Sequence, residues 1–96
     1  MEKQIEPFQL PAEMLKVLGH PVRMCILQGI IDNEGCNVSF MQNCVGLPQS
    51  TVSMHLQKLR AAGLITGERV GLEVHYALKD PKVKEIFQVF FAQPKQ

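Results

Sequence analysis

The chain has 96 residues, 46% of them hydrophobic, and a formal net charge of +1. This length supports one domain with a small core and is too short for two independent cores. No apolar run exceeds four residues, so the sequence predicts neither a membrane span nor a signal peptide, and the cytoplasm is the expected compartment. Three cysteines without regular spacing do not indicate a disulfide framework.

The few charges are unevenly distributed. Residues 1–34 carry three basic side chains against five acidic ones, which leaves the excess of positive charge to the rest of the chain. Between Glu34 and Lys58 no residue of either sign occurs. A surface that approaches phosphates gains from lacking carboxylates, because like charges repel there. The middle of the chain is therefore the candidate for a nucleic-acid contact.

The first half of the chain predicts an arm and three helices. Residues 1–10 are expected to form a flexible arm, because Pro7 and Pro11 limit regular structure. Helices are predicted from Pro11 to Leu18, from Pro21 to about Asp32, and from Ser39, as N-cap, to Val45. The second of these helices is apolar on almost every side, which predicts a central, buried position.

The rest of the chain is organised around the stretch from Leu47 to Ile65. Pro48 suits the first turn of a helix, and Gly63 suits a left-handed C-cap. An apolar stripe recurs between them at helical spacing, at Val52, Leu56 and Leu59. The opposite face is mostly short or neutral polar, and it comprises Ser50, Thr51, Met54, Gln57 and Lys58. Such a helix fits a DNA major groove, about 12 Å wide, and the alternative is an ordinary amphipathic helix with a solvated face.

A hairpin and a last helix follow this stretch. Strands are predicted at Leu64–Thr66 and Leu72–Leu78, with the tip Glu68–Val70 between two glycines. Asp80-Pro81 predicts the start of a last helix that ends near Ala92. That helix has more bulky apolar side chains than so small a core can bury, so it predicts an exposed patch that suits a second copy of the chain.

Three ordered motifs resemble the ArsR/SmtB family of bacterial winged-helix repressors, namely residues 18–23 (LGHPVR), 47–56 (LPQSTVSMHL) and 59–65 (LRAAGLI). The similarity runs from about residue 11 to 92, and the chain most resembles the PagR-like members that lack a metal site. The resemblance implies a mainly α (α+β) fold. It also implies a single winged helix-turn-helix domain over residues 1–96, with about five helices and a two-stranded wing.

The resemblance also implies a function. It indicates a sequence-specific transcriptional repressor that binds a near-palindromic operator in double-stranded DNA as a homodimer. An enzyme is the less favoured alternative, because the sequence has no nucleophile elbow, phosphate loop or carboxylate pair on one element, and no cofactor is expected. The symmetry of such a dimer explains two half-sites about one helical turn, or a multiple of it, apart. The rival interpretation is a winged-helix module that binds protein and not DNA, which the modest net charge favours.

Site residues are carried over from the family by position. The implied DNA contacts are Gln49, Ser50, Thr51, Ser53, Met54, His55, Gln57, Lys58 and, at the wing tip, Arg69. The implied dimer interface comprises Leu15, Leu18, Val83, Ile86, Phe87, Phe90 and Phe91. Met54 departs from the basic residue that is frequent at its position, and His55 could equally brace the helix.

The sequence offers little for metal sensing. Metal-binding relatives carry Cys-x-Cys at the start of the third helix, where this chain has Asn37 and Ser39, and residues 79–96 contain no His. No metal site is therefore expected. The candidate redox thiols are Cys36, which a turn should expose, and Cys44, which should pack near the helix that follows Pro48. Cys25 and Cys44 should be shielded, and plain packing is the alternative for all of these thiols.

Overall fold

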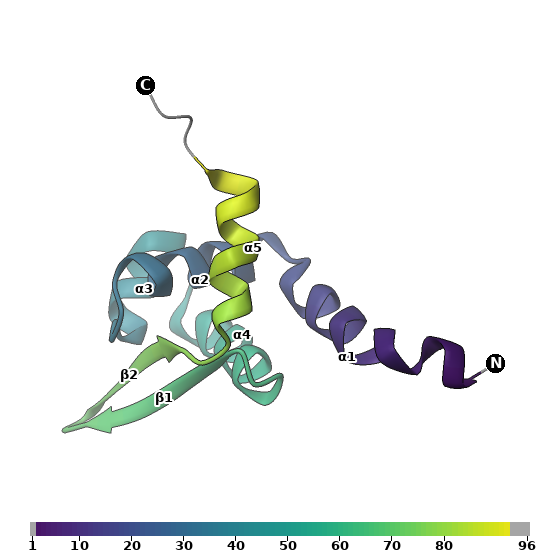
Figure 1. Ribbon diagram of the computed structural model, residues 1–96. Helices are drawn as coiled ribbons and strands as arrows, with labels where there is room; N and C mark the ends of the chain where they lie inside the picture. Colours follow the sequence, from purple (N-terminus) through teal and green to yellow (C-terminus); the bar gives the residue numbers. More distant parts are fainter. Residues whose placement is uncertain (1, 93–96) are drawn as a thin grey trace.

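The structure is a computed structural model that describes residues 2–92, with side chains from residue 4 onward. Its elements in chain order are α1 (Glu2–Leu18), α2 (Pro21–Asp32), α3 (Val38–Val45), α4 (Gln49–Ala61), β1 (Ile65–Val70), β2 (Glu73–Leu78) and α5 (Pro81–Phe91). α2, α3 and α4 gather into the body, the β-hairpin projects from it, and α1 extends away (Figure 1). This is the winged helix-turn-helix with five helices and a two-stranded wing that the sequence predicts.

The core lies where α2, α3 and α4 pack together. α4 contributes Val52, Leu56 and Leu59, each at most 1% exposed, so the predicted apolar stripe is confirmed. The facing side chains of α2 and α3 are Ile26, Leu27, Ile30 and Met41. Burying a side chain of this size stabilises the fold by about 1.5–3 kcal/mol. The stripe therefore fixes which face of α4 points outward.

Side-chain caps define where α2 and α3 begin. The Nδ1 atom of His20 accepts a hydrogen bond from the Val22 N–H at 3.2 Å. Asn37 Oδ1 accepts one from the Phe40 N–H at 2.9 Å. Each bond satisfies a backbone donor that the first turn of a helix leaves without a partner. α3 consequently begins one residue before the predicted N-cap Ser39.

Glycines make the turns on both sides of α4. Gly46 at the end of α3 has φ +68°, and Gly63 after α4 has φ +76°. Both values lie in the left-handed region, where a residue without a Cβ meets no steric penalty. The C-terminal turn predicted at Gly63 is confirmed, and together the two turns set the ends of the central helix.

The N-terminal segment differs from its prediction. α1 begins at Glu2 and continues through Pro7 and Pro11, in place of an arm over residues 1–10. Each proline removes one helical N–H, but the Glu, Lys and Gln residues around them favour a helix. Part of α1 is little covered by the rest of the chain, since Ile5, Phe8 and Leu10 are 53–78% exposed.

α1 and α2 meet at a sharp bend. The Gly19 N–H donates to the Leu15 carbonyl at 2.9 Å and closes the last turn of α1.

Over the residues searched, no single helix is long and apolar enough to cross a membrane. Only α1 and α2 taken together pass that test, and they are bent by 93°.

The hairpin is longer than predicted. β1 pairs antiparallel with β2, from Ile65 opposite Leu78 to Val70 opposite Glu73. The reversal lies at residues 71–72, so the predicted tip at residues 68–70 belongs to β1 instead. The longer pairing carries Arg69 on a strand near the end of the wing.

Gly67 lies within β1 at a position where no side chain fits. A Cβ at this position would lie 3.0 Å from a methyl group of Val74 and 3.1 Å from the ring of Tyr76. Those distances are shorter than packed carbon atoms tolerate, since the optimal separation is about 3.5–4.0 Å. The glycine therefore leaves the space that the side chains of Val74 and Tyr76 occupy.

Candidate nucleic-acid interface

The outward face of α4 is polar and open. Its exposed residues are Gln49, Ser50, Met54, Gln57 and Lys58, and Thr51 and Ser53 beside them are half-buried. Because the stripe of Val52, Leu56 and Leu59 is buried, this face is fixed toward solvent. The predicted DNA-contacting side chains of α4, apart from His55, therefore lie together on one side of the molecule.

This face also lacks negative side chains. Residues 35–67 contain no Asp or Glu, and their only charged residues are Lys58 and Arg60. Both basic residues lie in the last turn of α4. A neutral helix face with cations at one end can approach the negatively charged DNA backbone without carboxylate repulsion.

The wing supplies a second projecting element (Figure 1). Arg69 is exposed on β1, and Leu72 at the tip is 97% exposed. On β2, His75 Nε2 lies 3.0 Å from the Glu73 Oε1 atom. This contact lowers the pKa of the Glu73 carboxyl, with a smaller contribution from Asn37. Among the described residues Arg69 forms no ion pair, so its positive charge on the wing is available to a binding partner.

His55 does not belong to the exposed face. Its side chain is only 4% exposed, and its ring centroid lies 4.6 Å from that of His20. The structure therefore removes His55 from the predicted DNA contacts and agrees with the alternative that it braces the helix. The spacing could have shown this, because His55 lies three residues after Val52 and four before Leu59, within the buried stripe.

The predicted dimer interface divides into two groups. Leu18, Val83 and Phe87 are at most 5% exposed within one chain, so they belong to its core and not to an exposed interface. Val83 and Phe87 are four residues apart and share the inward side of α5. The other predicted residues stay accessible, with Ile86 half-buried and Leu15, Phe90 and Phe91 between 52% and 67% exposed. Val89, 81% exposed, was missed by the sequence reasoning.

The cysteines are placed the opposite way from the prediction. Cys36 is buried, whereas Cys25 and Cys44 are exposed. Cys36 lies inside because its carbonyl accepts a hydrogen bond from the Tyr76 N–H at 2.8 Å, which draws the turn against β2. Burial raises the pKa of the Cys36 thiol, so its reactive thiolate is disfavoured. The expected reactivity of Cys36 is therefore corrected.

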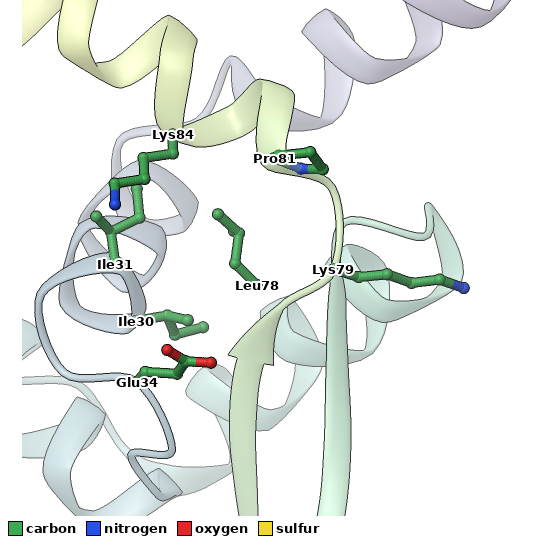
Figure 2. A pocket seen from close by; sticks show the side chains of 7 residues that line it. All are labelled: Ile30, Ile31, Glu34, Leu78, Lys79, Pro81 and Lys84. Atoms are coloured by element: carbon green, nitrogen blue, oxygen red, sulfur yellow. The ribbon is translucent and has the colours of Figure 1, made fainter.

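A shallow hollow of about 390 Å³ lies between the ends of α2 and β2 and the start of α5 (Figure 2). Its lining residues are Ile30, Ile31, Glu34, Leu78, Lys79, Pro81 and Lys84. The lining contains no Ser, Cys or His, and Lys79 points away from the hollow. Over the described part of the chain, no three His, Cys, Asp or Glu side chains are placed to hold a metal ion.

Known proteins share this arrangement. A helix-turn-helix domain family matches residues 18–68, from the end of α1 into β1. The transcriptional repressor PagR of Bacillus anthracis is 38% identical over 78 residues, which are 81% of this chain and 78% of that protein. The PagR crystal structure gives a TM-score of 0.80 at 35% identity, covering 90% of this chain and 98% of that one.

Two further proteins are similar. The HTH-type transcriptional repressor SmtB of Mycobacterium tuberculosis is 40% identical over 74 residues, 77% of this chain and 54% of that protein. Reduced HlyU from Vibrio cholerae gives a TM-score of 0.85 at 26% identity, covering 97% of this chain and 100% of that one.

Proposed function

Because this chain belongs to the ArsR/SmtB family of winged helix-turn-helix, DNA-binding transcriptional repressors, we propose that it binds its operator with the outward face of α4 in the major groove and the wing against the backbone. The observation that carries this assignment is the exposed polar face of α4 within a stretch, residues 35–67, that has no carboxylate. A DNA surface is the partner that such a face fits best.

The chemistry of the side chains suggests how sequence is read. A glutamine amide can bond both N6 and N7 of adenine, a serine hydroxyl can bond several base edges, and an apolar side chain can contact the thymine methyl group. The proposed contact set is Gln49, Ser50, Thr51, Ser53, Met54, Gln57 and Lys58 on α4, with Arg69 on the wing. Lys58 and Arg69 are suited to phosphates, which position the protein without reading sequence.

The exposed apolar side chains of α1 and α5 support a homodimer. Phe8 and Leu15 on α1, and Val89, Phe90 and Phe91 on α5, are each more than half exposed. Solitary exposed apolar residues are common, but two helices that both expose large ones are typical of an interface. A twofold dimer presents two α4 helices to half-sites about 34–36 Å apart, or a multiple of that spacing. Operator binding of this kind takes place in the cytoplasm.

Gln57→Ala and Ser50→Ala test the α4 face. Each substitution is expected to weaken binding to a duplex selected by the wild-type protein by about 1–3 kcal/mol, because each removes a base contact from an exposed residue. Fluorescence anisotropy measures the affinity, and circular dichroism checks the fold. Asn43→Ala, which removes an exposed carboxamide from α3 outside the proposed DNA contacts and dimer interface, serves as the control. Unchanged affinity in both α4 variants contradicts the assignment.

Arg69→Ala tests the wing. The substitution is expected to weaken binding to selected and to random DNA alike, since a phosphate contact carries no sequence information. The slope of log affinity against log salt should decrease in magnitude by about 0.9 for one lost contact. Lys79→Ala removes the same charge at the base of the wing and should leave the slope nearly unchanged. A wild-type slope in Arg69→Ala argues that the wing does not touch DNA.

A further inference from the structure

A pair of histidines joins the start of α2 to the middle of α4. The ring centroids of His20 and His55 lie 4.6 Å apart, with 54° between the ring planes. His20 is fixed in place because its Nδ1 accepts the Val22 N–H that caps α2. The pair is therefore a direct side-chain contact between a helix end and the proposed DNA-reading helix.

His55 is the buried member of the pair. It is 4% exposed, and its Nδ1 atom is shielded from solvent without a hydrogen-bond partner among the described residues. The exposed Met54 precedes it, and the exposed Gln57 lies two positions after it. A movement of the buried ring would consequently rotate or shift the side chains that we assign to DNA contact.

The ionisable groups that act on His55 are all basic. Those that act on its ring are His20 before α2, Arg23 on α2 and Lys58 on α4, and no carboxylate of the described residues is among them. Arg23 is held close because its Nε donates to the Val17 carbonyl at 2.7 Å. Burial, and then these basic groups, lower the pKa of His55, so the ring is neutral at neutral pH.

We propose that the His20–His55 pair positions α4 for DNA binding only while His55 is neutral, so that acidification weakens operator binding. A proton on His55 would place a cation in a buried site beside His20, Arg23 and Lys58 with no counter-charge. The packing of α4 against the start of α2 can relieve that cost only by loosening. The inference rests on the proposed DNA-reading face of α4, since that is the face the movement would disturb.

The sign of the effect follows from proton linkage. In the unfolded chain His55 has an ordinary pKa of about 6.5, whereas in the folded chain its pKa is lower. The unfolded state therefore binds more protons below neutral pH, and stability decreases as pH falls through about 6.5 toward the folded pKa. The direction is diagnostic for DNA binding too, because general protonation adds positive charge and would strengthen binding.

The experiment compares wild type with His55→Gln, which keeps a polar side chain but does not titrate. Affinity for a duplex selected by the wild type near pH 7.5 is measured by anisotropy near pH 7.5 and pH 5.5 at fixed ionic strength. The wild-type affinity is expected to fall about two- to threefold on acidification, because a histidine whose pKa lies below 6.5 is only partly protonated at pH 5.5. His55→Gln should lose most of this fall, and His75→Gln on the wing should retain it.

Two further measurements keep the test decisive. The free energy of urea unfolding, which needs no DNA, should decrease from pH 7.5 to pH 5.5 in wild type and less in His55→Gln. If His55→Gln does not fold, the ring resonances of wild-type His55 decide the matter by NMR, because their titration should coincide with the loss of binding. His20→Asn keeps an N-cap oxygen and should reduce the pH dependence in part.

Contrary results separate the two proposals. Affinity that stays constant or rises on acidification, or a fall that His55→Gln retains in full, overturns the coupling while leaving the DNA-reading face intact. A wild-type protein that selects no duplex at either pH contradicts the DNA-reading face itself, and the coupling with it.

Discussion

Phe90→Asp is expected to convert the proposed dimer into a folded monomer that no longer binds its operator tightly. Phe90 is 67% exposed on α5, so in a single chain the substitution removes little packing. In a dimer the same change places a carboxylate in an apolar interface, where an unpaired charge is strongly unfavourable. A monomer reads one half-site without the avidity of two, which costs about 10²–10⁴ in affinity.

Sedimentation velocity at micromolar concentration and anisotropy with the selected duplex measure the two effects together. Gln88→Asp is the matched control, because it adds the same charge at an exposed position on a different side of α5. It should remain dimeric if the interface uses the side that carries Phe90. A wild-type protein that sediments as a monomer, or a Phe90→Asp variant that remains dimeric, contradicts the proposed assembly.

Local chemistry was enough to predict α2, α4 and α5. Pro21 and Pro81 suit the first turn of a helix, and His20 and Asp80 cap those helices with their side chains. α4 was predicted from its apolar stripe and from the glycine after it. These signals lie within a few residues of the feature that they determine, so one sequence suffices to read them.

Features that depend on distant residues were predicted less well. Cys36 is buried because its backbone pairs with Tyr76, forty positions along the chain, and nothing near Cys36 indicates that partner. On α5 the apolar residues occur on several sides, so their spacing does not distinguish the core side from the exposed one. Contacts with the rest of the fold place Val83 and Phe87 inside, and leave Val89 and Phe90 outside.

The candidate site shows the same division. The outward face of α4 followed from its buried stripe, but His55 was assigned to DNA from its position in the family although its spacing placed it inside. A polar side chain at an inward position is easily misjudged, because burial of a histidine depends on what packs against it. Here that neighbour is His20, from an element far away in the sequence.

Phe87→Ala is expected to lower the free energy of unfolding by about 3–5 kcal/mol, in contrast to the effect of Phe90→Asp on assembly. Phe87 is 3% exposed, and its ring packs edge-on against Phe91 at 5.5 Å between centroids. It shares the core with Val83, which is fully buried. A domain of this size is stable by about 5–15 kcal/mol in total, so the loss is a large fraction.

The measurement is urea unfolding in the Phe90→Asp background, where dimer dissociation does not add to the unfolding free energy. Phe91→Ala is the matched control, because Phe91 is 52% exposed and its truncation removes the same atoms from a half-open site. The loss at Phe87 should clearly exceed the loss at Phe91, since a cavity forms only where neighbours surround the ring. Equal losses at the two positions would place Phe87 at the interface, as the sequence first suggested, and not in the core of one chain.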